Sequence, residues 1–301
     1  MALEWKGVMP AMTTCFKEDL SIDRDFAATH ARWLVNHGCT GIVTPGSLGE
    51  GATLTFEEKV ALWQTCVRAA GGGAPIVAAI SSLSMAEAVR LAQSAADQGC
   101  AGLMVLPPYV YRSDWREMKA HVAAVMRATR LSCMLYNNPI AYGTDFLPAQ
   151  IQELASEHEN FQSVKESSAD VRRVTAIRAI AGERLAVFVG VDDAIVEGIG
   201  VGAVGWIAGL ANALPKESVD LFNYARNGER AKAFKLYAWF LPLLRMDTVP
   251  KFVQLIKLVQ VEVGMGNARV RPPRLELAGA ELEEARATIH AALRNRPSLY
   301  A

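Results

Sequence analysis

Short apolar segments alternate with longer amphipathic segments along most of the 301-residue chain, and this alternation restricts the fold more than any other feature. Segments such as 76–80 (IVAAI) and 103–106 (LMVL) are apolar on both faces, as strands buried in a parallel sheet are. The pattern predicts strands at 7–14, 41–44, 75–80, 101–106, 132–136, 161–166, 185–190 and 203–207.

A helix is predicted after each of these strands. Thr55 and Ser84 each stand where a helix N-cap belongs, with a glutamate three residues later, as in a capping box. The predicted helices cover 23–36, 113–128, 148–157, 170–181 and 215–226, and others begin at Thr55, Ser84 and Asp192. Eight strand–helix units predict an α/β fold of the (βα)8 TIM-barrel type. An open doubly wound sheet is the alternative, but no GxGxxG motif follows the first strand.

The last part of the chain predicts a C-terminal three-helix appendage. Long helical segments cover 229–247, 248–264 and 280–293, and Pro250 fits the first turn of the second. We therefore divide the chain into a catalytic barrel, 1–227, and a helical extension, 228–301. The extension is too apolar for a free tail, so we expect it to pack on the barrel or to line a subunit contact.

Composition and charge narrow the functional classes. The formal net charge is zero, which gives no basic field for nucleic acid or an anionic membrane. The five cysteines form no CxxC pair, and the five histidines fall on predicted helices, so neither a disulfide framework nor a metal site is expected. Because no signal-peptide or membrane-spanning run is visible, we expect a cytoplasmic protein.

Several polar side chains follow the strands of the predicted barrel. Active sites of TIM barrels lie at the C-terminal ends of the strands. These ends carry the predicted catalytic residues Lys165, Tyr136 and Ser47, and the predicted substrate-binding residues Leu48, Gly49, Tyr109, Ile207, Ala208 and Gly209.

Lys165 is the residue on which the predicted chemistry depends. Burial in a barrel disfavours the ammonium form, and a neutral amine can attack a carbonyl carbon to form a Schiff base. Read alone, the segment around Lys165 is more typical of a strand-end lysine whose amine reaches solvent. Its place among the other strand-end residues favours the catalytic interpretation.

The neighbouring candidates also have structural interpretations. The turn at 46–49 can present N–H groups and the Ser47 hydroxyl to a carboxylate, or be an ordinary glycine-rich turn. Tyr136 can move protons beside the lysine, or simply cover the end of the barrel. We expect Glu50 to fix the turn through its N–H groups, and Asp192 and Asp193 to cap a helix.

Three motifs occur in order at the ends of strands two, five and six: GSLGE at 46–50, YNNP at 136–139 and VKES at 164–167. Together they resemble the dihydrodipicolinate synthase / N-acetylneuraminate lyase family of class I aldolase-type barrels, over nearly the whole chain. The resemblance implies that Lys165 forms an imine with a 2-oxo acid or cyclic imine, with no other cofactor. It implies that Tyr136 shuttles protons and that Ser47 and N–H groups near Leu48 hold the substrate carboxylate. It also implies a homotetramer built as a dimer of dimers.

The chain departs from the synthase pattern at three positions. The second hydroxyl residue of the turn is replaced by Leu48, a tyrosine after Pro-Tyr by Val110, and an arginine after the YNNP motif by Ala141. The missing arginine and tyrosine argue against the synthase activity itself. Tyr111 is a possible substitute for the missing tyrosine, although it would face the opposite way on a strand.

Leu48 and the segments 244–254 and 271–275 resemble the subgroup of Δ1-pyrroline-4-hydroxy-2-carboxylate deaminase, an enzyme of hydroxyproline breakdown. Our first hypothesis is therefore a lysine-imine deaminase that forms 2-oxoglutarate semialdehyde. The alternatives are a pyruvate-dependent lyase or aldolase, 4-hydroxy-tetrahydrodipicolinate synthase, and a barrel that only binds a ligand.

Overall fold

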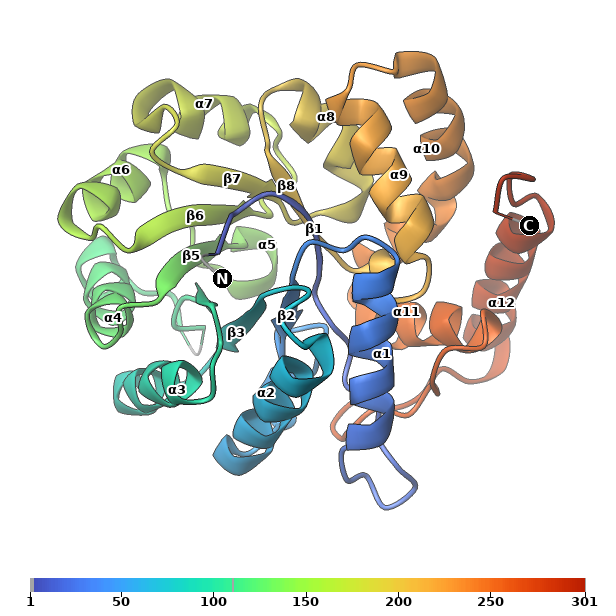
Figure 1. Ribbon diagram of the computed structural model, residues 1–301, viewed down its shortest axis with the longest axis horizontal. Coiled ribbons are helices and arrows are strands. Elements are labelled where there is room, and N and C mark those ends of the chain that lie inside the picture. Colours follow the sequence, from blue (N-terminus) through green and yellow to red (C-terminus); the bar gives the residue numbers. More distant parts are fainter. Residues whose placement is uncertain (1–2, 110, 301) are drawn as a thin grey trace.

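The computed structural model describes residues 3–109 and 111–300. Its centre is a sheet of eight parallel strands, surrounded by helices (Figure 1). The strands are β1 (Gly7–Pro10), β2 (Ile42–Thr44), β3 (Ile76–Ile80), β4 (Gly102–Val105), β5 (Ser132–Asn137), β6 (Phe161–Glu166), β7 (Ala186–Val189) and β8 (Gly205–Ala208).

The strands follow one another around a TIM barrel, as predicted. Their order is β1-β8-β7-β6-β5-β4-β3-β2, and β1 pairs in parallel with β8. Between the two ends of this order, a parallel bridge joins Ala11 to Val43. Nearly every strand residue is buried, because the barrel interior and the surrounding helices cover both faces of each strand.

Helices follow the strands, most of them on the outside of the barrel, whereas the one-turn helix after β5 lies at the C-terminal end of that strand. They are α1 (Arg24–Asn36), α2 (Phe56–Ala70), α3 (Met85–Asp97), α4 (Trp115–Arg127), α5 (Pro139–Tyr142), α6 (Pro148–Glu157), α7 (Arg172–Ala181), α8 (Ile195–Gly200) and α9 (Pro215–Arg226). Single 3-10 turns are η1 (Gly51–Thr53), η2 (Asp192–Ala194), η3 (Leu210–Asn212) and η4 (Arg245–Asp247).

The local signals explain most helix starts. Thr55 and Glu58 form the predicted capping box of α2, and the Ser84 side chain accepts a hydrogen bond from the N–H of Glu87. Helix α4 is capped by Asp114, not Ser113, because the Asp114 carboxylate accepts from the N–H of Glu117. The first strand is shorter than predicted.

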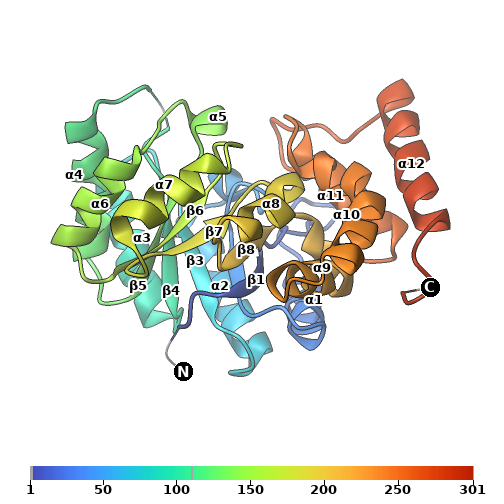
Figure 2. The same cartoon turned by 90° about the horizontal axis from the view of Figure 1, so that it is seen from above.

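The C-terminal helices are α10 (Arg230–Leu244), α11 (Phe252–Glu262) and α12 (Gly279–Arg294), close to the predicted ranges. Helix α11 begins after Pro250, because residues 248–251 form bends and turns, so our placement of Pro250 inside the helix was wrong. In Figure 2, α12 lies outside α10 and α11, at the edge opposite α4 and α6. The boundary at 227 stays a prediction.

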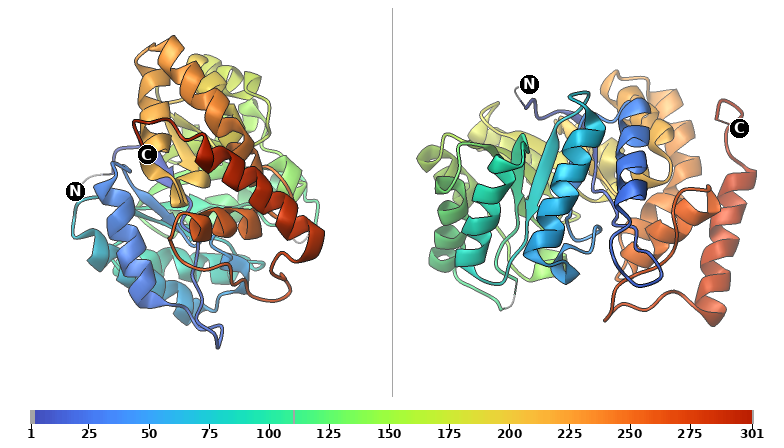
Figure 3. Two further views of the ribbon diagram at one scale, coloured as in Figure 1. Left: turned by 90° about the vertical axis from the view of Figure 1, so that its right-hand side faces the viewer. Right: turned by 60° about the horizontal axis from the view of Figure 1, so that its bottom comes forward.

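The extension also reaches the start of the chain. In Figure 3 the loop before α1 lies beside the segment that joins α11 to α12. There, Arg271 donates to the carbonyl oxygen of Leu20, and Asn267 donates to that of Phe16. All five cysteines are free and buried. In the parts of the chain that the structure describes, no helix has the length and apolar character needed to span a membrane.

Candidate active site

A cavity of about 760 Å³ opens at the C-terminal ends of the strands. Its walls come from several strands and from the segment before α11. Of the residues predicted from the sequence, seven line it: Ser47, Leu48, Tyr109, Tyr136, Lys165, Ile207 and Gly209. The barrel therefore brings together predicted residues that are up to 162 positions apart, from Ser47 to Gly209.

Lys165 lies near the end of β6 and points into this cavity. The residue is only 6% exposed, and its Nζ lies 3.9 Å from the centroid of the Tyr136 ring. Among the described residues, no carboxylate forms an ion pair with it. Gly190, after β7, leaves room for the lysine, because a Cβ there would stand 2.5 Å from the Lys165 Cε.

Three aromatic rings surround the space next to the amine. Tyr136 is the register partner of Lys165 on the neighbouring strand, and its hydroxyl accepts a hydrogen bond of 3.0 Å from the Asn138 side chain. The Tyr142 ring lies edge-on to Tyr136, with 5.7 Å between centroids, and 5.6 Å from the Tyr109 ring.

Tyr142 is a cavity residue that our sequence analysis missed. Its hydroxyl hydrogen-bonds the Ser47 hydroxyl and its ring packs edge-on against Tyr136, so Tyr142 contacts two of the predicted catalytic residues. Burial, and to a lesser degree Tyr136, raise the pKa of the Tyr142 phenol well above its usual value, which keeps it a neutral O–H group. The signal was present in the sequence: Asn138 caps a one-turn helix that has Pro139 at its start and Gly143 at its end.

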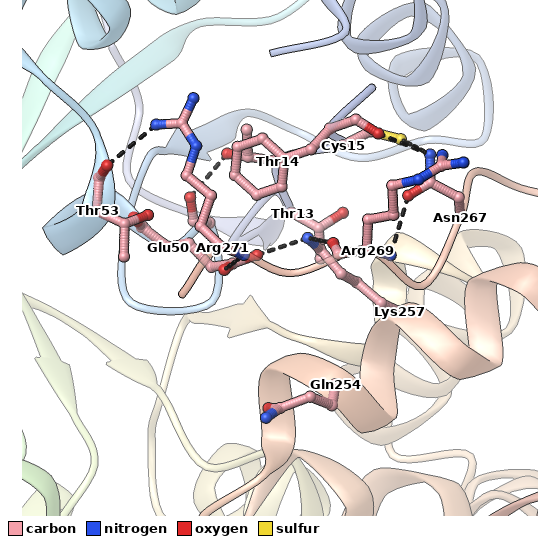
Figure 4. Close-up of polar contacts among 12 residues, drawn as sticks. Thr13, Thr14, Cys15, Glu50, Thr53, Gln254, Lys257, Asn267, Arg269 and Arg271 are labelled. Carbon is pink, nitrogen blue, oxygen red and sulfur yellow. Dashed lines mark hydrogen bonds and ion pairs between the residues drawn. The ribbon is translucent and has the colours of Figure 1, made fainter. Parts of the chain in front are cut away.

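The turn that carries Ser47 is fixed from the C-terminal extension. The Glu50 carboxylate is fully buried, 2.5 Å from Lys257 Nζ of α11, and it accepts a second bond of 2.9 Å from the Arg271 N–H (Figure 4). Glu50 itself has a φ of 55°, in the left-handed region that few non-glycine residues adopt. Our expectation that Glu50 binds the N–H groups of its own turn was wrong.

Similarity to known proteins extends over nearly the whole chain. Residues 4–292 match the dihydrodipicolinate synthetase family. The chain belongs to this family. It is 32% identical, over 282 residues, to the 4-hydroxy-tetrahydrodipicolinate synthase of Moorella thermoacetica, covering 94% of this chain and 95% of that one. Against the protein of the same name from Methanoculleus marisnigri, identity is 32% over 288 residues, with 94% and 97% covered.

Solved structures of the dihydrodipicolinate synthetase family have the same fold. The 4-hydroxy-tetrahydrodipicolinate synthase of Methylacidiphilum fumariolicum SolV superposes with a TM-score of 0.93 at 25% identity, covering 97% of each chain. YagE, a family protein from Escherichia coli K12 solved in complex with pyruvate, gives 0.90 at 25% identity, covering 97% of this chain and 99% of YagE.

Two residues that we predicted to bind substrate do not line the cavity of this family member. Ala208 stands between Ile207 and Gly209, and successive strand residues face opposite sides, so it points away. Gly49 lies behind the turn, where a Cβ would come within 2.6 Å of the Met12 carbonyl oxygen. Each adjoins a residue that does line the cavity, and a role of Gly49 and Ala208 in substrate binding stays a prediction.

Tyr111 does not replace the missing tyrosine within this cavity. The residue is 53% exposed and lies outside the lining, whereas Tyr142 occupies the space beside Tyr136. Val110, which stands at the position of the missing tyrosine, lies outside the described residues. Ala141 lines the cavity, as does Leu48, so this wall is apolar.

Two carboxyl groups near Lys165, one fully buried and one partly exposed, come from the segments after β7 and before α11. We expected Asp192 to cap a helix, but its side chain accepts from Trp206 Nε1 and from the N–H groups of Gly209 and Leu210. Burial raises the pKa of Asp192 to about 6, although these donors and Lys165 oppose the shift. The second carboxyl, Asp247, lines the cavity and was also missed. In residues 3–109 and 111–300, no group of three His, Cys, Asp or Glu is arranged to hold a metal ion.

Proposed function

We propose that this chain is a lysine-imine enzyme that deaminates and dehydrates Δ1-pyrroline-4-hydroxy-2-carboxylate to 2-oxoglutarate semialdehyde. The family consists of aldolase-type lyases, and the substrate is our own assignment. One observation carries the proposal: Lys165 is a buried lysine without a carboxylate partner among the described residues, and it faces a cavity beside a phenol. Such an amine is available for attack on a C=N or C=O carbon.

The remaining groups suit the steps of this reaction. Lys165 attacks C2 of the ring, and the bond between C2 and the ring nitrogen breaks, which leaves an amine on C5. The hydroxyl on C4 then leaves as water. Ser47 and the N–H groups of its turn bind the single carboxylate of the substrate. The hydroxyls of Tyr136, Ser47 and Tyr142 supply and remove protons close to the lysine. Proton transfers then move the resulting C3=C4 double bond to C4=C5 and convert the C5 amine into an imine. Water hydrolyses this imine and the lysine imine, which releases ammonia from C5 and frees Lys165.

The apolar wall favours this substrate over one with two carboxylates. Leu48 and Ala141 line the cavity at the positions where the synthase pattern has a hydroxyl residue and an arginine. A second carboxylate placed against this wall would be buried without a partner, which is costly. A substrate with one carboxylate avoids that cost. We propose that the enzyme works without a further cofactor and assembles as a homotetramer.

A second candidate is 4-hydroxy-tetrahydrodipicolinate synthase. It is favoured by the names of the relatives that are 32% identical over most of the chain. It would require Lys165 to bind pyruvate and the cavity to bind aspartate semialdehyde, whose carboxylate would have no arginine at position 141.

A direct assay separates these candidates. The purified protein is incubated with Δ1-pyrroline-4-hydroxy-2-carboxylate, and release of ammonia and semialdehyde is followed. Lys165→Ala is compared with Lys216→Ala, which removes an exposed lysine on α9. We expect turnover by the wild type and Lys216→Ala and none by Lys165→Ala.

Other outcomes select the alternatives. No ammonia, together with a borohydride-trapped pyruvate adduct and condensation with aspartate semialdehyde, would replace the deaminase by the synthase. A trapped pyruvate adduct without that condensation would indicate another pyruvate-dependent lyase or aldolase. A protein that forms no borohydride adduct at Lys165 with any of these compounds would instead be a ligand-binding barrel.

A further inference from the structure

Asp247 brings a carboxyl group from the C-terminal extension into the barrel cavity. It is the last residue of η4, between α10 and α11, and it lies over Gly209 at the end of β8. A Cβ on Gly209 would stand 2.1 Å from Asp247 Oδ1, so this position needs glycine for the carboxyl to fit. Both residues line the cavity that holds Lys165.

The Asp247 carboxyl has no hydrogen-bond donor or ion-pair partner in the described part of the chain, which distinguishes it from its neighbour Asp192. Asp192 is held by three donors and has no position free to react. Burial and the nearby Asp192 charge raise the pKa of Asp247 well above its usual range, with a smaller contribution from Asp193, while Lys165 opposes the shift. The surroundings therefore fix Asp192 through its donors and leave Asp247 as the carboxyl that carries a proton.

The position of Asp247 relative to Lys165 limits which substrate atoms it can reach. Around the barrel, β8 lies midway between β6, which carries Lys165, and β2, which precedes Ser47, and Asp247 lies over the end of β8. A substrate whose carboxylate lies at Ser47 and whose C2 is bonded to Lys165 therefore has one side that faces Asp247. We place C4 of the substrate on that side.

We propose that Asp247 is the general acid that protonates the hydroxyl leaving from the carbon β to the lysine imine. This role rests on the proposed deaminase reaction. In the imine, C3 first loses a proton to water, which gives an enamine with a C2=C3 bond. The nitrogen lone pair then re-forms the C2=N bond, the C2=C3 pair moves to C3=C4, and the C4–O bond breaks. The leaving oxygen takes the Asp247 proton and departs as water, and the carboxylate regains a proton from solvent.

The test compares two leaving groups. Ammonia release is measured for the wild type and Asp247→Asn with the 4-hydroxy substrate and with its 4-chloro analogue, because chloride leaves without being protonated. We expect Asp247→Asn to lower kcat for the hydroxy substrate by about 10²-fold, with little change in KM. With the chloro analogue, kcat should stay within about threefold of the wild type.

Two controls separate this role from a structural one. Asp170→Asn removes a partly exposed aspartate, paired with Arg172 and outside the cavity lining, and should leave both activities unchanged. Borohydride trapping of pyruvate, followed by intact mass, should show that Asp247→Asn still forms the Lys165 adduct.

Each remaining outcome overturns a defined statement. An equal loss with both leaving groups, or no loss with either, overturns the acid role while the deaminase stands. A wild type that releases no ammonia overturns the proposed function, and with it a hydroxyl-protonating role for Asp247, even if the pyruvate adduct forms.

Discussion

Lys165 and Lys257 are both buried lysines near the same end of the barrel, but their surroundings differ. Lys257 is 1% exposed, and its Nζ lies 2.5 Å from the Glu50 carboxylate and 2.6 Å from the Arg269 carbonyl oxygen. Lys165 is 6% exposed and faces the Tyr136 ring and an open cavity. Burial is therefore common to both, and the partners decide what each amine can do.

The difference explains why one lysine holds structure and the other is free to react. Burial lowers the pKa of Lys257, but the Glu50 charge and hydrogen bond oppose this shift and occupy the amine. A buried ion pair with satisfied hydrogen bonds keeps both charges in place. The Lys165 amine has an aromatic face on one side and space for a substrate carbon on the other. We infer that the Lys165 amine is free to act as a nucleophile because no carboxylate in the described part of the chain forms an ion pair with it.

Replacing each lysine by methionine, which is similar in length, tests this comparison. The largest effect is expected for Lys165→Met, which should lower ammonia release by about 10⁴-fold or more, because no amine remains to form the imine. Its unfolding midpoint in urea should stay close to that of the wild type, since the Lys165 amine forms no ion pair with the described residues that the substitution would break. Ammonia release that survives in Lys165→Met would contradict the inference that the Lys165 amine is the nucleophile.

Lys257→Met should have its main effect on stability. It leaves the Glu50 carboxylate buried and without its cation, which should lower the free energy of unfolding by roughly 3–5 kcal/mol. Urea unfolding followed by circular dichroism measures the change. The double variant Lys257→Met/Glu50→Gln should be more stable than Lys257→Met, because no uncompensated charge remains. If the stability losses of Lys257→Met and Glu50→Gln simply added in the double variant, the ion pair would not be the cause of the Lys257→Met loss.

The contrast between the lysines also separates what the sequence could predict from what it could not. The eight strands and the positions of Lys165, Tyr136 and Ser47 follow from short patterns, and the structure places all three residues in one cavity. Lys257, the partner of Glu50, is 207 positions away in α11, and the hydrophobic periodicity of that helix does not reveal the contact. Asp247 reaches the cavity through a turn that we predicted as helix. Contacts of the C-terminal extension depend on packing, which local patterns do not specify.

Tyr142 offers the next test, because it lies in the aromatic surroundings that distinguish Lys165 from Lys257. Tyr142→Phe keeps the ring against Tyr136 and removes the hydroxyl that bonds Ser47. Loss of one proton-transfer group should lower kcat by about 10²-fold with a smaller change in KM. Steady-state ammonia release measures both constants. Tyr111→Phe, on an exposed tyrosine outside the cavity, is the matched control and should behave as the wild type. A Tyr142→Phe enzyme as fast as this control would remove Tyr142 from the proton-transfer group.

Lys59 is a third buried lysine and an intermediate case. Its Nζ donates to the Ser81 carbonyl oxygen at 3.0 Å, and burial lowers its pKa while Glu87 opposes the shift. Lys59→Met loses one hydrogen bond but also relieves an ammonium that is costly to bury, so the two effects largely cancel. We expect a loss of about 1 kcal/mol in the free energy of unfolding, well below that of Lys257→Met. Activity should fall little, because Lys59 does not line the cavity. A loss of stability as large as that of Lys257→Met would mean that one carbonyl oxygen and a nearby carboxylate are enough to make a buried lysine structural. The direct ion pair with Glu50 would then no longer explain why Lys257 stabilises the fold and Lys165 does not.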